Sequence, residues 1–69
     1  MTQTRYRIFK RTWWADAACT IPRAGRKTTV DYVYGSEAAG RACQRLNTEE
    51  YGSPQGRGPR GMGHEFEVA

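Results

Sequence analysis

The sequence predicts a small α+β fold in which a three-stranded, antiparallel-type sheet carries one helix on one face. Three observations support this fold class. Residues 4–13 and 28–34 are rich in aromatic and β-branched side chains, which favours strands. Residues 36–47 carry apolar side chains at helical spacing. Residues 64–68 alternate again and predict a short last strand, so the order is β-β-α-β.

The first expected strand, Thr4–Trp13, has two different faces because successive side chains of a strand alternate. Tyr6 and Ile8 fall on one face. The opposite face carries basic and aromatic side chains: Arg5, Arg7, Phe9, Arg11 and Trp13. The second strand, Thr28–Tyr34, alternates in the same way, and we expect it to place Asp31 on the basic face.

The expected helix begins at Ser36, which can cap its first turn, and ends at Asn47 in a left-handed conformation. Its apolar stripe consists of Ala39, Ala42, Cys43 and Leu46. A right-handed crossover through this helix sets the third strand parallel to the second. The first strand then lies between them, in spatial order 2-1-3, and the helix covers the face with Tyr6, Ile8, Phe66 and Val68.

The 69 residues form one domain, with mobile loops expected at about residues 15–27 and 48–63, which contain glycine and proline. A chain of this length buries only about 60% of the surface that its unfolded form exposes, so its core is thin. No apolar run is long enough to span a bilayer, which predicts a cytoplasmic protein without membrane contact. Cys19 and Cys43 are then most simply free thiols, although a disulfide between them stays open.

The formal net charge of +4 is unevenly distributed. Residues 1–30 carry seven Lys and Arg against one acidic residue, whereas residues 31–69 carry four against six. This asymmetry predicts an anionic partner, which can be nucleic acid or an acidic protein surface.

Two surfaces are candidates for binding. The first is the basic face of the first strand, where interleaved arginines and Phe9 are typical of single-stranded nucleic-acid binders. Cross-strand pairing of the arginines with Glu65, Glu67 and Asp31 is the favoured interpretation of this face, because it leaves little positive field.

The second candidate surface is the end of the sheet where the first strand finishes and the long loops converge. Arginine and tryptophan there suit phosphate contact or a protein interface. Adjacent residues of a strand face opposite ways, so at most one of the two tryptophans is expected in the core, and the other needs a different explanation. The expected binding residues are Lys10, Arg11, Trp13, Trp14, Arg23, Arg26, Lys27, Arg57 and Arg60.

Catalysis, metal binding and cofactor binding are not expected. His64 is the only histidine and lies on the inward face of the last strand. Cys43 belongs to the apolar stripe, where a thiol packs as a small hydrophobe. The chain has no closely spaced cysteine pair, and the stretch Gly56–Gly61 lacks the pattern of a phosphate-binding loop.

Four stretches, Tyr6–Trp14, Ala24–Thr28, Ser36–Asn47 and Glu65–Glu67, resemble small, mostly uncharacterised proteins of bacterial viruses and prophages. The resemblance concerns fold and core and assigns no functional residue. Proteins of this size and origin include anti-CRISPR inhibitors, which block host nucleoprotein complexes by stoichiometric binding. Inhibitors that imitate DNA are acidic, whereas this chain has a pI of about 9.5.

The residues predict a binding protein without enzymatic activity. The resemblance implies a phage or mobile-element accessory protein that binds a host protein or nucleoprotein complex, such as a CRISPR–Cas inhibitor. The alternative is a basic nucleic-acid-binding module that contacts phosphates through arginines and stacks bases on tryptophan. The chain is expected to be a monomer or a weak homodimer paired through an exposed edge strand.

Overall fold

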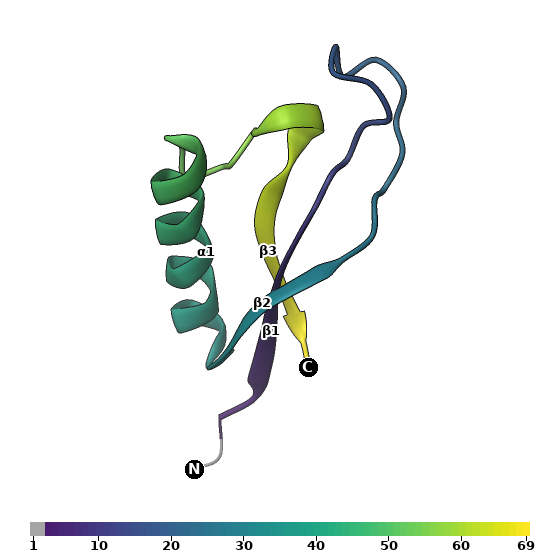
Figure 1. Ribbon diagram of the computed structural model, residues 1–69. Helices are drawn as coiled ribbons and strands as arrows, with labels where there is room; N and C mark the ends of the chain where they lie inside the picture. The colour runs from purple at the N-terminus through teal and green to yellow at the C-terminus, as the bar shows by residue number, and fades with distance from the viewer. Residues whose placement is uncertain (1–2) are drawn as a thin grey trace.

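The computed structural model describes residues 3–69 and contains three strands, one α-helix and one short 3-10 helix. In chain order these are β1 (Arg5–Arg11), β2 (Thr28–Tyr34), α1 (Ser36–Tyr51), η1 (Pro59–Gly61) and β3 (Gly63–Val68). Both β2 and β3 pair with β1 in the antiparallel sense, in the order β2-β1-β3. The predicted α+β fold and strand order are confirmed. Figure 1 shows α1 on one side of the sheet, with no element on the other side.

The core between α1 and the sheet is thin. Ile8 and Ala39 are fully buried, and Cys43 is 6% exposed. Ala42 and Leu46, which belong to the predicted apolar stripe, are half-buried. A domain of this size has little interior, so these few side chains supply most of its apolar burial on the helix side.

The helix differs from its prediction at both ends. Gly35, with φ of 90°, precedes the first turn, and no side chain caps it, so the expected cap at Ser36 is wrong. The helix continues past Asn47 to Tyr51 and ends at Gly52, which adopts the left-handed conformation with φ of 75°. Glycine adopts the left-handed conformation without steric cost. The Gly52 N–H donates to the carbonyl of Thr48, four residues earlier.

Asn47 lies inside the helix, and its side chain forms hydrogen bonds that connect α1 with the loop at Pro54 and with β3 at His64. Its amide Nδ2 donates to the carbonyls of Pro54, at 3.1 Å, and His64, at 3.3 Å. Its Oδ1 accepts the His64 backbone N–H at 2.6 Å and lies 2.9 Å from His64 Nδ1. The imidazole is 6% exposed, as its inward position predicts, and its Nε2 lies 3.3 Å from Glu50 Oε2.

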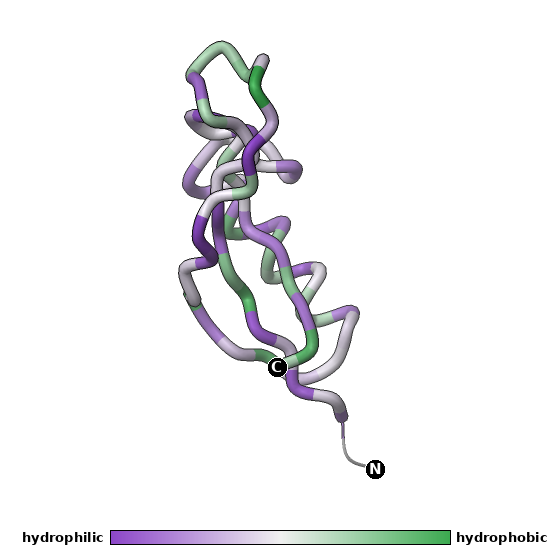
Figure 2. The backbone as a smooth tube through the Cα atoms, turned by 90° about the vertical axis from the view of Figure 1, so that its right-hand side faces the viewer, coloured by the Kyte–Doolittle hydropathy of each residue, from purple (hydrophilic) through white to green (hydrophobic). Residues whose placement is uncertain are grey.

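The segment between β1 and β2 forms a hairpin arm (residues 12–25), where a loop was expected. Backbone bonds continue the antiparallel pairing beyond the sheet, from Gly25 N to Thr12 O at 2.8 Å and from Ala15 N to Ile21 O at 2.8 Å. At the tip, Asp16 Oδ1 accepts the N–H groups of Thr20 and Ile21. Figures 1 and 2 show the arm projecting beyond the rest of the chain, with hydrophobic residues at its tip.

The second expected loop also contains regular structure. Helix α1 takes up its first four residues, and η1 takes up three more before β3 begins. The segment between α1 and β3, which includes η1, is the glycine-rich loop (residues 52–62), and it runs from the end of α1 to the base of the arm. Within residues 3–69, no helix is both long enough and apolar enough to cross a membrane.

Candidate binding surface

The outer sheet face is the side of the sheet that α1 does not cover. Directly opposed residues of antiparallel strands project from the same face. The register pairs Arg5 with Tyr34, Arg7 with Tyr32 and Phe9 with Thr29, and on the other side Arg7 with Glu67 and Phe9 with Glu65. This face therefore carries Arg5, Arg7, Phe9, Arg11, Thr29, Tyr32, Tyr34, Glu65 and Glu67.

Phe9 occupies the middle of the outer sheet face and is only 3% exposed, although no helix covers it. Three cations cover its ring instead. The Lys27 ammonium lies 4.8 Å from the ring centroid, and the guanidinium carbons of Arg11 and Arg7 lie at 5.5 Å and 5.7 Å. The alkyl stems and cationic heads of such side chains cover an aromatic face well. The ring is therefore closed to a stacking base.

Carboxylates from β3 hold these cations in place. Glu67 pairs with Lys27 at 2.6 Å and with Arg7 at 3.1 Å, and Glu65 lies 3.4 Å from Arg11. The hydrogen bond from Lys27, together with the positive charges of Lys27 and Arg7, lowers the pKa of Glu67. The expected pairing of strand-one arginines with Glu65 and Glu67 is confirmed, and the middle of this face is scaffold.

Asp31 does not belong to the outer sheet face, so the third expected pairing is wrong. It lies opposite Ile8, on the face that carries α1, and its Oδ1 accepts the Tyr32 N–H at 2.7 Å. The register of β2 against β1 shifts between Ile8 and Phe9, where β2 contains one extra residue. Thr29 therefore stays on the outer face opposite Phe9, whereas Asp31 turns to the helix side and Tyr32 and Tyr34 turn outward.

At the end of the outer sheet face where β1 begins and β2 ends, the exposed side chains are aromatic. The Tyr32 and Tyr34 side chains are 49% and 59% exposed, and the Arg5 guanidinium carbon lies 4.8 Å from the Tyr32 ring centroid. No carboxylate within residues 3–69 forms an ion pair with Arg5. Tyr32 and Tyr34 are not among the predicted binding residues, although their Tyr-x-Tyr alternation places two rings on one face of a strand.

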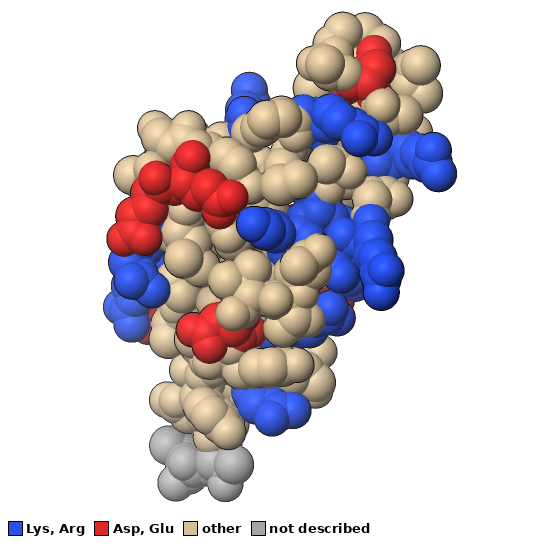
Figure 3. Space-filling model, viewed as in Figure 1, with Lys and Arg blue, Asp and Glu red and all other residues tan. Residues whose placement is uncertain are grey.

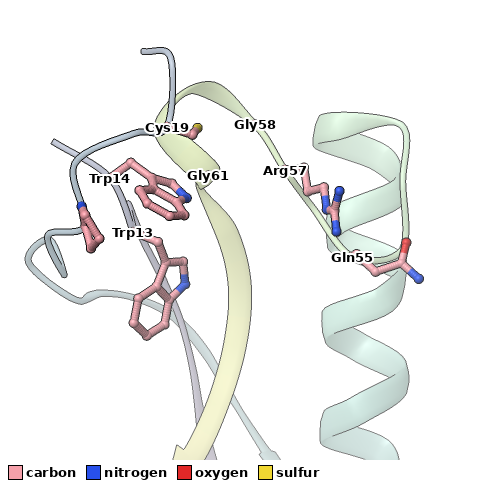
Figure 4. A pocket seen from close by; sticks show the side chains of 8 residues that line it. Trp13, Trp14, Cys19, Gln55, Arg57, Gly58 and Gly61 are labelled. Carbon is pink, nitrogen blue, oxygen red and sulfur yellow. The ribbon is translucent and has the colours of Figure 1, made fainter. Parts of the chain in front are cut away.

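The opposite end of the molecule contains a pocket of about 690 Å³ between the hairpin arm and the glycine-rich loop. Figure 4 shows both tryptophans on the arm side and Arg57 across the gap. The pocket is lined by Trp13, Trp14, Cys19, Pro22, Gln55, Arg57, Gly58 and Gly61. Both tryptophans line it although antiparallel pairing continues past Arg11, because the backbone bends at Trp13 and strict alternation is lost there. Neither tryptophan is a fully buried core residue.

Arg60 positions the tryptophans by its backbone and side chain. Its carbonyl accepts the N–H groups of Trp13, at 3.1 Å, and Trp14, at 3.2 Å, and its Nε donates to the Trp14 carbonyl at 3.0 Å. A Cβ at the neighbouring Gly61 would lie 2.6 Å from Trp14 Cδ1, so only glycine allows this close approach. The glycine-rich loop is thus packed against the base of the arm.

The nine expected binding residues fall into three groups. Lys10, Arg11 and Lys27 are in ion pairs, with Glu50, Glu65 and Glu67 respectively. Trp13, Trp14 and Arg60 form the junction of the arm with the glycine-rich loop. Within residues 3–69, no carboxylate pairs with the remaining exposed arginines, which are Arg23, Arg26 and Arg57.

The charges are segregated in space as well as along the chain. Figure 3 shows Lys and Arg gathered on the side of the sheet away from α1 and at the base of the arm, with a smaller basic group over α1. Acidic side chains gather over the end of α1 that leads into the glycine-rich loop, and one acidic group lies at the tip of the arm, in the same view. A partner that approaches the base of the arm or the outer sheet face therefore meets mainly positive charge.

Residues 3–69 contain no group of three or more His, Cys, Asp or Glu side chains that could hold a metal ion. Cys19 lies exposed at the arm tip and Cys43 is buried in α1, each as a free thiol. Burial raises the pKa of the Cys43 thiol, and the charge of Glu65 adds to this rise. Comparison of the chain with protein-family models, curated proteins and solved structures finds no match, so the resemblance to phage proteins stays a prediction.

Proposed function

We propose that this protein acts by stoichiometric binding to a host protein or nucleoprotein complex, which it engages through the hairpin arm. The observation that supports this proposal is the pocket lined by two tryptophans of the arm and by Arg57 of the glycine-rich loop. Tryptophan and arginine are enriched among the residues that dominate the energy of protein interfaces. Inhibition of a CRISPR–Cas complex by a phage-encoded protein is one instance of such binding.

The construction of the arm favours a docking role. Its backbone pairing and the Asp16 bonds at its tip hold the chain in one conformation before any partner binds. A preorganised surface loses little conformational entropy on association. Ile21, which is 58% exposed, adds an apolar contact near the tip of the arm.

The charge of the arm selects the kind of partner surface. Arg23 lies on the returning strand of the arm and Arg26 directly follows the base of the arm; both are exposed and have no ion-pair partner within residues 3–69. Free guanidinium groups favour carboxylates or phosphates, to which arginine can form two parallel hydrogen bonds. The arm therefore fits an acidic protein surface or the nucleic-acid channel of a nucleoprotein complex.

Affinity purification with the tagged protein tests this proposal. We expect a defined complex from the bacterium that carries the gene, with the tagged protein at a fixed ratio by native mass spectrometry. Arg23→Glu with Arg26→Glu is expected to reduce its recovery at least about tenfold, because like charges across an interface repel. The variant leaves every ion pair of the sheet intact, which a change at Lys27 does not.

The matched control is Arg41→Glu with Arg45→Glu, which makes the same change of charge at two exposed positions of α1. It is expected to recover the complex as the wild type does. Equal recovery with the arm variant and the wild type would show that the arm is not the docking surface. Equal loss with both double variants would show that only the total charge matters.

A further inference from the structure

We infer that the outer sheet face is a binding platform for single-stranded nucleic acid, on which Tyr32 and Tyr34 stack bases. This inference concerns a surface other than the arm and does not depend on the proposed function. Its starting observation is that two tyrosine rings stand about half exposed on the side of the sheet that no element covers. Exposed rings on an open sheet are what base stacking needs.

The spacing of the two rings suits adjacent bases. Tyr32 and Tyr34 are two residues apart on β2 and project from the same face. Their Cα atoms are separated by roughly 6.5–7 Å, the rise of two strand residues. An extended single strand running along β2 can place one base on each ring, whereas paired bases in a duplex hide their faces from such a platform.

A cation lies close to the exposed rings. The Arg5 guanidinium lies over the Tyr32 ring, 4.8 Å from its centroid, and has no carboxylate partner within residues 3–69. Among the described residues it is the only cation over this ring, and Tyr32 stays 49% exposed, whereas Phe9 under three cations is 3% exposed. Further along the face, Arg7 and Lys27 share the single carboxylate of Glu67. The displacement of Asp31 to the other face of the sheet leaves four cations, Arg5, Arg7, Arg11 and Lys27, against two carboxylates.

The same face is poorly suited to a protein partner. The centre of a protein interface is largely apolar and is depleted of Lys, Glu and Asp, although Arg is enriched there. Here the central aromatic ring, Phe9, is buried under three cations, and the exposed rings lie to one side of it. A charged centre beside exposed aromatic rings matches a sugar–phosphate backbone with its bases turned toward the rings.

Fluorescence anisotropy with labelled oligonucleotides tests the inference. The probes are oligo-dT and oligo-rU of about ten nucleotides, a length within the range of sites on small binding domains. A duplex of equal length serves as the third probe. We expect binding of the single strands at micromolar concentration in about 50 mM salt, weakening as salt rises, with the duplex bound at least about fivefold more weakly.

Substitutions separate stacking from general attraction. Tyr32→Ala and Tyr34→Ala are each expected to weaken binding about fivefold or more, whereas Tyr→Phe at either position keeps the ring and is expected to retain it. Val68→Ala is the matched control, because Val68 is 67% exposed but lies opposite Tyr6 on the helix side of the sheet. Arg5→Ala is expected to make the dependence of affinity on salt shallower.

The inference is overturned by absence of single-strand binding at about 50 mM salt, or by duplex binding of equal strength. It is also overturned if both Tyr→Ala variants bind as the wild type does, including the case in which Arg23→Glu with Arg26→Glu abolishes binding and so assigns nucleic acid to the arm. The tyrosine variants are expected to leave recovery of the host complex unchanged, so failure of this inference and failure of the proposed function are distinguishable.

Discussion

The middle of the outer sheet face and the hairpin arm contain the same types of residue, but they use them differently. In the middle of the face, Arg7, Arg11 and Lys27 are paired with glutamates and cover the buried Phe9 ring. In the arm region, Arg23, Arg26 and Arg57 have no ion pair within residues 3–69, and Trp13 is 37% exposed.

The difference lies in the neighbouring strand. Strand β3 brings Glu65 and Glu67 opposite Phe9 and Arg7, whereas the arm extends beyond the reach of these carboxylates. Basic and aromatic residues in alternation therefore do not by themselves mark a binding site. Whether they are available to a partner depends on which acidic side chains the fold places beside them.

The largest expected effect is on the free energy of unfolding, and it distinguishes Phe9 in the middle of the outer sheet face from Trp13 in the arm. Phe9→Ala is expected to lower the free energy of unfolding by about 3–5 kcal/mol, because it empties a buried site. Trp13→Ala is expected to lower it by less than about 1.5 kcal/mol, since the side chain is partly exposed. Urea denaturation of both variants measures the difference, and a larger loss for Trp13→Ala would reverse our assignment of scaffold and surface.

The next effect concerns the junction of the arm with the glycine-rich loop. Gly61→Ala is expected to cost at least about 1 kcal/mol more than Gly52→Ala, because a Cβ at Gly61 overlaps the Trp14 ring. The two glycines have nearly equal φ, 74° and 75°, but no atom lies within 4 Å of a Cβ at Gly52. Equal midpoints in urea denaturation would show that Trp14 is not held against the loop.

A smaller effect is expected from reversing the charge of two adjacent residues. Lys27→Glu places a carboxylate beside Glu67 and uncovers part of Phe9, so we expect a lower midpoint of thermal unfolding. Arg26→Glu changes an exposed side chain without an ion pair, and its unfolding free energy is expected to stay within about 0.5 kcal/mol of the wild type. If Arg26→Glu destabilises as much as Lys27→Glu, the arm is not free of the pairing found on the sheet.

The smallest expected effect is a gradual dependence of stability on pH, which arises from His64 on the helix side of the sheet. Burial lowers the pKa of His64 below its ordinary 6.5; the charge of Glu50 opposes this shift and that of Lys10 adds to it. The unfolded state therefore binds more protons between pH 6.5 and the lower folded pKa. The contribution of His64 to stability is complete above pH 6.5 and is lost as the pH falls through the folded pKa.

Urea denaturation between pH 8 and pH 5 tests this dependence. As the pH falls below about 6.5, the midpoint urea concentration of the wild type is expected to decrease, and that of His64→Gln is expected to change less. The lowered pKa values of Glu67 and Asp16 act only below their ordinary values of 4.5 and 3.8, so they do not contribute in this range. A wild-type midpoint that is constant over this range would show that His64 is not held neutral by burial.

Much of the fold was predictable from local patterns. Alternation in residues 4–13, 28–34 and 64–68 and helical spacing after Gly35 were enough for the element order and the strand order. The end of the helix was not predictable from Asn47 alone, because its side chain forms hydrogen bonds with Pro54 and His64 that no local pattern reveals. The Asp31 error has a similar origin, since register depends on how β2 pairs with β1.

The sequence by itself determined which strand residues alternate between the two faces, where the basic residues concentrate and that the single histidine faces inward. These properties depend on neighbours a few positions apart. Only the tertiary structure decided which arginines are paired with carboxylates, that the two tyrosines rather than Asp31 face outward, and that residues 12–25 form a projecting arm beside a tryptophan pocket. These features join residues far apart in the chain, and the pairing of strands across the sheet brings them together.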